Sequence, residues 1–276
     1  MHLVIQGADV ATPDLKHLAK LSTASRIERL TPEAFRLCDA HPAAAIAEAC
    51  ERAQLDYAFV PETRRLADFR LLVMDMDSTL ITIETVDELA DMVGVKPQVA
   101  AITAQAMRGE IEYNESLERR VALLAGLDES ALDRVYEERL KLSPGAEKLL
   151  AAVKRAGLKT LLVSGGFTRI TGRLRPRLGL DYTYANTLES QAGKLTGRLL
   201  GGIVNAEGKR DELVRVRDAL GIERSQIIAI GDGANDLKFM AAAGVSIAYH
   251  AKPVVRSQAT HALNYVGLDG VLNLFN

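Results

Sequence analysis

The chain has 276 residues, of which 48% are hydrophobic and 25% are charged, and its formal net charge is −2. This composition is typical of a folded protein, and the balanced charge argues against a nucleic-acid partner. No apolar run approaches the roughly 18 residues that a membrane span needs, and the N-terminus lacks a signal-peptide pattern, so we expect a cytoplasmic protein without a membrane partner. Two cysteines, Cys38 and Cys50, do not have a zinc-binding spacing, and we expect reduced, buried thiols.

Residues 1–68 alternate short apolar strands with two helices. The strand candidates are MHLVIQ, SRIERL, AFRLCDA and DYAFVPE, and the helix candidates are PDLKHLAKLS and the Ala-rich PAAAIAEACERAQL. The resulting order β-α-β-β-α-β predicts a small ferredoxin-like α+β domain, similar in topology to the ligand-binding modules of the ACT type. Such a domain would bind an amino acid, form a homodimer or only stabilise the chain, and no motif decides among these roles.

The rest of the chain alternates continuous apolar runs with helical stretches. The strand candidates are Phe69–Met74, Leu158–Val163, Ile227–Ile230, Val245–Tyr249 and Ala262–Val266, and the helix candidates include Gly145–Arg155, Asp211–Leu220 and Asp236–Ala243. Apolar strands that alternate with helices predict an α/β fold, a doubly wound, Rossmann-like core with a parallel sheet. Ligands of such sheets bind at the carboxyl ends of the strands.

A long insertion interrupts this pattern between residues 84 and 142. It reads as a series of helices, with Gly94, Gly109 and Gly126 at positions expected for helix C-caps. The insertion is either a solvated helical bundle or a cap over the strand ends. We therefore predict three domains: 1–68 as the N-terminal domain, 69–83 together with 143–276 as the core, and 84–142 as the cap.

Polar clusters follow three of the predicted strands. Asp75 and Asp77 follow the first strand and point to the same side, where a cation would relieve the repulsion between their carboxylates. Ser164, Gly165 and Gly166 follow the second strand and suit a phosphate, because they offer a hydroxyl and accessible N–H groups before a helix. Each cluster taken alone is also compatible with a polar turn.

The third cluster is the sequence GDGAND, which contains Asp232, Asn235 and Asp236. Its glycines allow a tight turn that brings the backbone and Asp232 close to a ligand. Lys209 has no local signal of its own and would be a surface residue unless a buried anion needs a positive charge.

The order DxDxT, SGG, Lys, GDGxxD resembles the haloacid-dehalogenase-like phosphohydrolase superfamily. The segments VMDMDSTLITIET, AMRGEIEYNESLERRVALL, LVSGGF and AIGDGANDLKFMAAAGVSIAYHAKP are similar to the phosphoserine phosphatase family within it, over roughly residues 70–276. The resemblance implies Mg²⁺-dependent hydrolysis of O-phospho-L-serine, the last step of serine biosynthesis.

The resemblance also implies a role for each matching residue. Asp75 would attack phosphorus to form an aspartyl-phosphate, and Asp77 would protonate the leaving oxygen and later activate water. Mg²⁺ would be held by the carboxylates of Asp75 and Asp232 and the main-chain carbonyl of Asp77. The groups expected to hold the phosphoryl oxygens are Ser164, the Gly165 amide, Lys209 and Asn235.

The substrate's amino-acid end would be recognised by the helical insertion. Glu84 matches the partner of the ammonium group and Arg120 the partner of the carboxylate, whereas Arg119 is expected to be solvated. Met107 and Tyr113 match apolar pocket positions, although a place in the helix core would explain them equally well.

Two other functions remain open at this point. A related enzyme would transfer the phosphoryl group to another alcohol, such as homoserine, or act on another small phosphorylated amino acid. A catalytically idle amino-acid sensor would use the N-terminal domain, but it would have no need for Asp75, Asp77, Lys209 and Asp232 together. Neither GxxxxGK[ST] nor GxGxxG follows a predicted strand, which argues against P-loop and dinucleotide-binding proteins.

Overall fold

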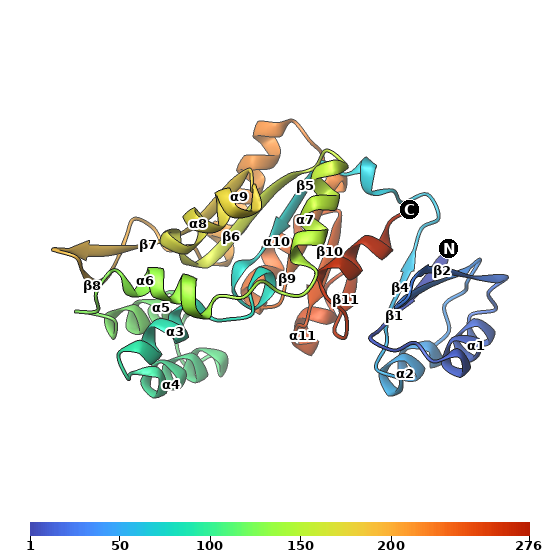
Figure 1. Cartoon of the computed structure of the whole chain (residues 1–276), viewed down its shortest axis with the longest axis horizontal. Coiled ribbons are helices and arrows are strands. Elements are labelled where there is room, and N and C mark those ends of the chain that lie inside the picture. Colours follow the sequence, from blue (N-terminus) through green and yellow to red (C-terminus); the bar gives the residue numbers. More distant parts are fainter. The chain divides into compact units, whose positions relative to one another are not determined.

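A computed structural model describes all residues of the chain, Met1–Asn276 (Figure 1). The chain forms two compact units. The first unit comprises Met1–Leu72, Ser143–Lys159 and Gly221–Asn276, and the second unit comprises Val73–Leu142 and Thr160–Leu220. The boundaries of the three predicted domains stay a prediction. No helix is both long and apolar enough to span a membrane.

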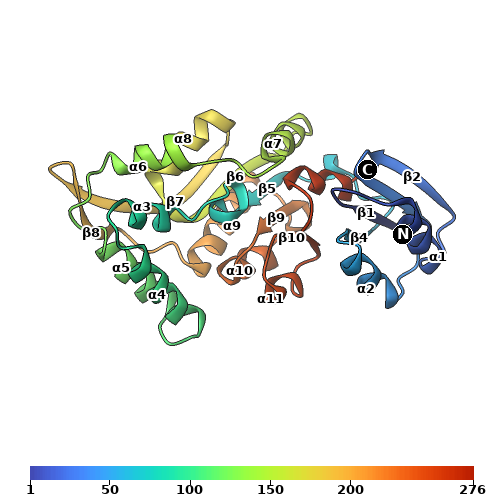
Figure 2. The same cartoon turned by 60° about the horizontal axis from the view of Figure 1, so that its bottom comes forward.

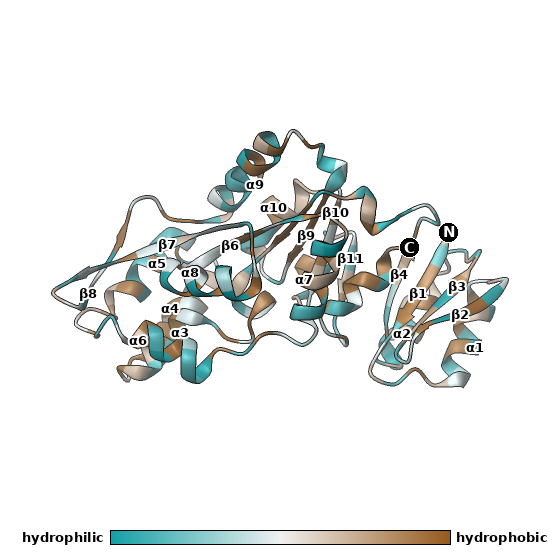
Figure 3. Cartoon of the chain, turned by 45° about the horizontal axis from the view of Figure 1, so that its top comes forward, coloured by the Kyte–Doolittle hydropathy of each residue, from teal (hydrophilic) through white to brown (hydrophobic).

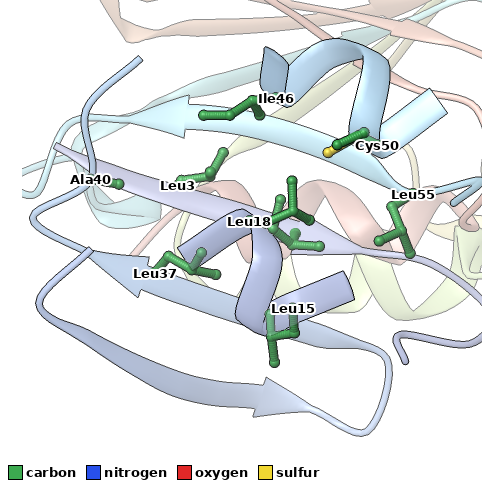
Figure 4. Close-up of a cluster of buried hydrophobic side chains, with 10 residues drawn as sticks. Leu3, Leu15, Leu18, Leu37, Ala40, Ile46, Cys50 and Leu55 are labelled. Atoms are coloured by element: carbon green, nitrogen blue, oxygen red, sulfur yellow. The ribbon is translucent and has the colours of Figure 1, made fainter. Parts of the chain in front are cut away.

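The N-terminal part of the first unit is an antiparallel four-stranded sheet with two helices. Its elements are β1 His2–Gln6, α1 Thr12–Leu21, β2 Arg26–Thr31, β3 Ala34–Cys38, α2 Ala45–Arg52 and β4 Asp56–Val60. The strand order β2-β3-β1-β4 confirms the predicted β-α-β-β-α-β arrangement. Leucines of β1, α1 and β3 pack with Ile46 and Cys50 of α2 in one buried cluster (Figure 4). Both cysteines are free and buried, as expected.

The remainder of the first unit contains parallel strands. These are β9 Ile227–Gly231, β10 Val245–Tyr249 and β11 His261–Leu263, with helices α7 Ala146–Arg155, α10 Leu237–Ala241 and α11 Pro253–Arg256. Every residue of β9 and β10 is buried, and both strands are strongly hydrophobic (Figure 3). Helix α10 packs against both strands, and α11 packs against β10 (Figure 2).

Strand β5 (Leu71–Met74) belongs to both units, because its first two residues lie in the first unit and its last two in the second. At its start, Arg70 N–H donates to the Gln226 carbonyl, and the Arg70 carbonyl accepts from Lys159 N–H, each at 2.8 Å. The four apolar side chains of β5 are all buried, as a central strand requires.

The second unit combines strands with the helical insertion. Its elements are α3 Thr85–Met92, α4 Lys96–Met107, α5 Tyr113–Ala122, α6 Ala131–Arg134, β6 Lys159–Phe167, α8 Thr168–Leu178, β7 Tyr182–Gln191, β8 Lys194–Leu200 and α9 Ala206–Leu220. Strand β6 pairs parallel with β7, and β7 pairs antiparallel with β8. The predicted α/β class and the helical nature of the insertion are therefore confirmed. Gly94, Gly109 and Gly126 have φ between 72° and 85°, as their predicted positions after helices require.

The β7–β8 hairpin (Figure 1) is the main element that the sequence pattern did not predict. Its strands are mostly half-exposed and lack a continuous apolar run. Its turn has positive φ at Ala192 and Gly193, but it lacks the Asn-Gly or Asp-Gly pair that marks such turns. Helix α9 begins at Ala206 rather than at Asp211, so Lys209 lies inside the helix.

Candidate active site

Asp75 directly follows β5, and its carboxylate is almost completely buried. Asp75 Oδ1 accepts a hydrogen bond from Met76 N–H at 2.7 Å and lies 2.8 Å from Nζ of Lys209. Lys209 is wholly buried on α9, so it is not the surface residue that its local sequence would suggest. The buried ammonium group compensates the charge of a carboxylate that has little access to water.

Asp77 lies two residues further along a turn in which Ser78 adopts a positive φ of 56°. Its Oδ1 accepts a hydrogen bond from the hydroxyl of Thr85 at 2.6 Å. Burial is the largest of the effects that raise the pKa of Asp77 to about 8, and the negative charge of Glu84 adds to it. The hydrogen bonds from Thr85 and the charge of Lys209 oppose this rise in pKa. Such a carboxyl group keeps its proton near neutral pH.

Glu84 immediately precedes α3, and its Oε1 accepts a hydrogen bond from the Ser78 hydroxyl at 2.6 Å. Glu84 is nevertheless exposed by its accessible surface. Desolvation by the surrounding protein raises the pKa of Glu84, although the Ser78 hydrogen bond and the positive charge of Arg120 oppose this rise. Arg120 is half-buried on α5 and acts electrostatically on Glu84 and Asp87. Neighbouring Arg119 forms an exposed ion pair with Glu115, as expected of a solvated residue.

Ser164 and the two glycines after it lie at the end of β6. Ser164 is fully buried, and its Oγ accepts a hydrogen bond from Gly166 N–H at 2.8 Å, so its hydroxyl proton remains available to another acceptor. A Cβ built on Gly166 would lie 3.1 Å from Asp77 Oδ2. The second oxygen of Asp77 therefore faces the Ser164–Gly166 segment.

Asn186 of β7 connects the Ser164–Gly166 segment to Val204 through hydrogen bonds. Its amide donates to the Gly165 carbonyl at 2.8 Å, and its Oδ1 accepts from Val204 N–H at 2.8 Å. The side chain is buried with both of its polar ends paired. Neither Asn186 nor Thr85 was a candidate from the sequence, because one lies on an unpredicted strand and the other is one of several threonines without a motif.

Tyr113 and Met107 differ in their surroundings. The Tyr113 hydroxyl lies so close to Gly165 that a Cβ at that position would collide with it. Tyr113 is half-buried beside the Ser164–Gly166 segment. Met107 ends α4 with 63% of its surface exposed, so in this structure it neither lines an enclosed pocket nor belongs to the helix core.

In the first unit, Asp236 organises the loop after β9. Its Oδ2 accepts hydrogen bonds from the N–H groups of Asp232 and Gly233 at 3.1 and 3.0 Å, and its side chain is fully buried. A Cβ on Gly231 would come within 2.6 Å of the same carboxylate, so only glycine fits there. Asp232 and Asn235 are partly accessible on this loop. The conformation of the loop thus depends on Asp236, while Asp232 remains accessible as an oxygen ligand.

Comparisons with known proteins agree on one family. Residues 72–241 match the family described as haloacid dehalogenase-like hydrolase, and residues 3–46 match a domain of unknown function. The chain is 56% identical over 215 residues to a phosphoserine phosphatase of Polaromonas sp. (strain JS666), a match that covers 76% of this chain and 91% of the relative.

Solved structures give the same result. A HAD family hydrolase from Salmonella enterica serovar Typhi is similar at a TM-score of 0.89 and 34% identity, over 100% of this chain and 98% of that chain. A substrate-bound phosphoserine phosphatase complex is similar at a TM-score of 0.71 and 34% identity, over 75% of this chain and 99% of that chain.

Proposed function

Because the chain belongs to the haloacid dehalogenase-like hydrolase family and, within it, to the phosphoserine phosphatases, we propose that it hydrolyses O-phospho-L-serine to L-serine and phosphate as the last step of serine biosynthesis. One arrangement of side chains carries this proposal. Asp75 is held by Lys209, while the free oxygen of Asp77 faces the Ser164–Gly166 segment. The residues that we propose as nucleophile, proton donor and phosphate-binding segment all belong to the second unit.

In the first step, Asp75 attacks phosphorus and forms an aspartyl-phosphate. The bond between phosphorus and the serine oxygen breaks, and Asp77 transfers its proton to that oxygen. The raised pKa of Asp77 supports this role, because a carboxyl group that is protonated near neutral pH can act as a general acid. In the second step, Asp77 accepts a proton from the attacking water, and the bond between Asp75 and phosphorus breaks.

The phosphoryl oxygens carry the developing negative charge. We assign them to the Ser164 hydroxyl, the Gly165 amide, Lys209 and Asn235. Ser164 is suited to this role because its Oγ already accepts from Gly166 N–H, which leaves the hydroxyl as a donor. Donors that are already oriented stabilise transition-state charge without reorganisation.

A divalent metal ion is part of the proposal. The acidic residues Asp75, Asp232 and Asp236 supply oxygen donors, the chemistry that a hard cation such as Mg²⁺ prefers. Asp75, Asp232 and the Asp77 carbonyl would hold Mg²⁺, and Asp236 would support the loop, because its Oδ2 already accepts from two backbone N–H groups. When bound, Mg²⁺ neutralises negative charge shared by Asp75 and the phosphate.

Substrate selection is assigned to the helical insertion. Glu84 would pair with the ammonium group of phosphoserine, and Arg120 with its carboxylate. The electrostatic interaction between these two residues supports the assignment, because a zwitterion needs one charge of each sign close together. Tyr113 would border the substrate through its position beside Gly165. Met107 would have to move to contact substrate, because it is largely exposed.

The cellular context is proposed on two further observations. Two buried free thiols suit the reducing cytoplasm, where we propose that the protein is located.

Strand β2 is an edge strand with Ile27 exposed, and pairing of this edge between two chains would form a homodimer. Sedimentation of wild-type protein and an Ile27→Lys variant tests the dimer: a monomeric wild type excludes it, and dissociation by the substitution supports it.

The covalent intermediate provides the direct test of the mechanism. Acid-quenched enzyme mixed with phosphoserine that carries a radioactive phosphoryl group should retain label on the protein, and hydroxylamine should release it. Asp75→Asn should retain none, because an amide is a poor nucleophile. Equal labelling of Asp75→Asn would remove Asp75 from this role. Radiolabel transferred to added homoserine instead of water would favour the phosphotransferase alternative.

A further inference from the structure

Thr85 is a buried hydroxyl residue that the reaction described above does not use. It is the first residue of α3, has no exposed surface and donates from Oγ1 to Asp77 Oδ1 at 2.6 Å. A backbone hydrogen bond from Thr85 reaches the same carboxyl group. One residue therefore supplies two hydrogen-bond donors to Asp77.

These two donors determine the orientation of the Asp77 carboxyl group. A carboxyl group with one oxygen hydrogen-bonded to a rigid element has only one oxygen left for proton transfer. The remaining oxygen, Oδ2, lies on the side of Gly166, where a Cβ would approach it to 3.1 Å. The Thr85 bond thus directs Oδ2 toward the segment assigned to the phosphate.

Two other donors near this turn are already used by other carboxylates. The Ser78 hydroxyl donates to Glu84, and the backbone Met76 N–H donates to Asp75. The position of Thr85 is itself fixed, because Thr85 is the first residue of a helix that buries Val86 and Leu89. A rigid neighbour helps to keep a reactive group within about 0.5 Å of its working position.

We propose that Thr85 is a positioning residue that aims the proton of Asp77 at the leaving oxygen of the substrate. The inference rests on the proposed function. As the Asp75–phosphorus bond forms, the bond from phosphorus to the ester oxygen breaks, and the Asp77 Oδ2 proton moves to that oxygen. Loss of the Thr85 hydroxyl leaves Asp77 able to carry the proton but held by the backbone bond alone, so that the carboxyl group can rotate away from the ester oxygen.

The experiment compares two leaving groups. Serine leaves as an alkoxide that needs the proton, whereas 4-nitrophenolate leaves without one. The quantity compared is kcat/KM, because it reports the steps up to release of the alcohol or phenol. For Thr85→Val we expect kcat/KM for phosphoserine to fall about 10- to 100-fold, part of the roughly 10²–10⁴-fold that general acid catalysis supplies. The value for 4-nitrophenyl phosphate should change less than about threefold.

Two further variants separate positioning from folding. Thr85→Ser keeps the hydroxyl and should restore most of the phosphoserine activity. Thr171→Val removes another buried threonine hydroxyl, on α8, whose bond is to the Thr168 carbonyl, and should leave both substrates unaffected. Equal losses of Thr85→Val on both substrates, or failure of Thr85→Ser to restore activity, would overturn the inference. A wild type inactive on phosphoserine but active on 4-nitrophenyl phosphate would instead overturn the proposed substrate.

Discussion

Lys209 Nζ lies 2.8 Å from Asp75 Oδ1, and the two side chains are only 1% and 7% exposed. A buried ion pair is a costly arrangement unless both charges have a further use, because each loses its hydration. In the mechanism proposed here, the lysine keeps Asp75 ionised for attack and then faces the phosphoryl oxygens. The pair is therefore better explained by catalysis than by stability.

Lys209→Met should abolish measurable turnover and lower the free energy of unfolding by about 3–5 kcal/mol, because Asp75 would be left buried without a counter-charge. Urea unfolding in EDTA measures this loss without a metal ion to compensate. Lys194→Met is the matched control, because Lys194 forms an ion pair with Asp128, at 3.5 Å, in which both side chains are exposed to solvent. Its stability should change by less than about 0.5 kcal/mol. Equal stability of the two variants would contradict the assigned role of the buried pair.

Gly165→Ala should lower activity, because the new methyl group would meet the Tyr113 hydroxyl. Tyr113→Phe removes that oxygen, and the nearest ring carbon, Cζ, would be 3.6 Å from the new Cβ. The double variant should therefore recover a large part of the activity that Gly165→Ala loses. Steady-state rates for the four proteins form a double-mutant cycle. If the losses of activity in the two single variants simply add in the double variant, the contact between residues 113 and 165 does not cause the loss in Gly165→Ala.

Arg120→Ala should reduce kcat/KM for phosphoserine by about 10²-fold or more, because a charged hydrogen bond to the substrate carboxylate is lost. Hydrolysis of phosphoethanolamine, which has no carboxylate, should change much less. Arg119→Ala provides the control, since Arg119 pairs with Glu115 at the surface. If Arg120→Ala affects both substrates alike, the residue has a structural role.

Stability should fall in mild acid because of His261. Its Nε2 lies 2.6 Å from Arg64 Nη1, and burial, followed by the charge of Arg64, lowers the pKa of His261 from 6.5 to about 4. The unfolded chain therefore takes up the proton first as the pH falls. The stabilisation is complete above about pH 6.5 and is lost progressively toward pH 4.

Between pH 7.5 and 5, this residue should account for about 2 kcal/mol of the loss in unfolding free energy. Urea unfolding at both pH values, compared with a His261→Gln variant, measures this share. The variant should show a pH dependence that is weaker by that amount. An identical pH dependence in both proteins would contradict the assignment.

Much of the site could be predicted because its residues follow strands in recognisable motifs. Asp75 and Asp77 after β5, Ser164 and Gly165 at the end of β6, and Asp232 after β9 were all expected at strand ends. Their positions along the sequence carry the signal, because ligands of α/β sheets bind at the carboxyl ends of strands.

The supporting residues could not be predicted from the sequence. Asn186 lies on a hairpin strand of half-buried polar residues, and Thr85 acts through a hydrogen bond that no motif records. Lys209 was expected before a helix, but α9 begins earlier and buries it. Tertiary packing determines each of these positions, and local sequence patterns contain little information about it.

The most direct test of the central claim is phosphate release from L-phosphoserine, phosphothreonine and 4-nitrophenyl phosphate, each with Mg²⁺ and with EDTA. We predict hydrolysis that requires the metal ion and is fastest for L-phosphoserine. Metal-dependent hydrolysis without that preference would contradict the roles of Glu84 and Arg120, and the absence of hydrolysis of all three would contradict the proposed function itself.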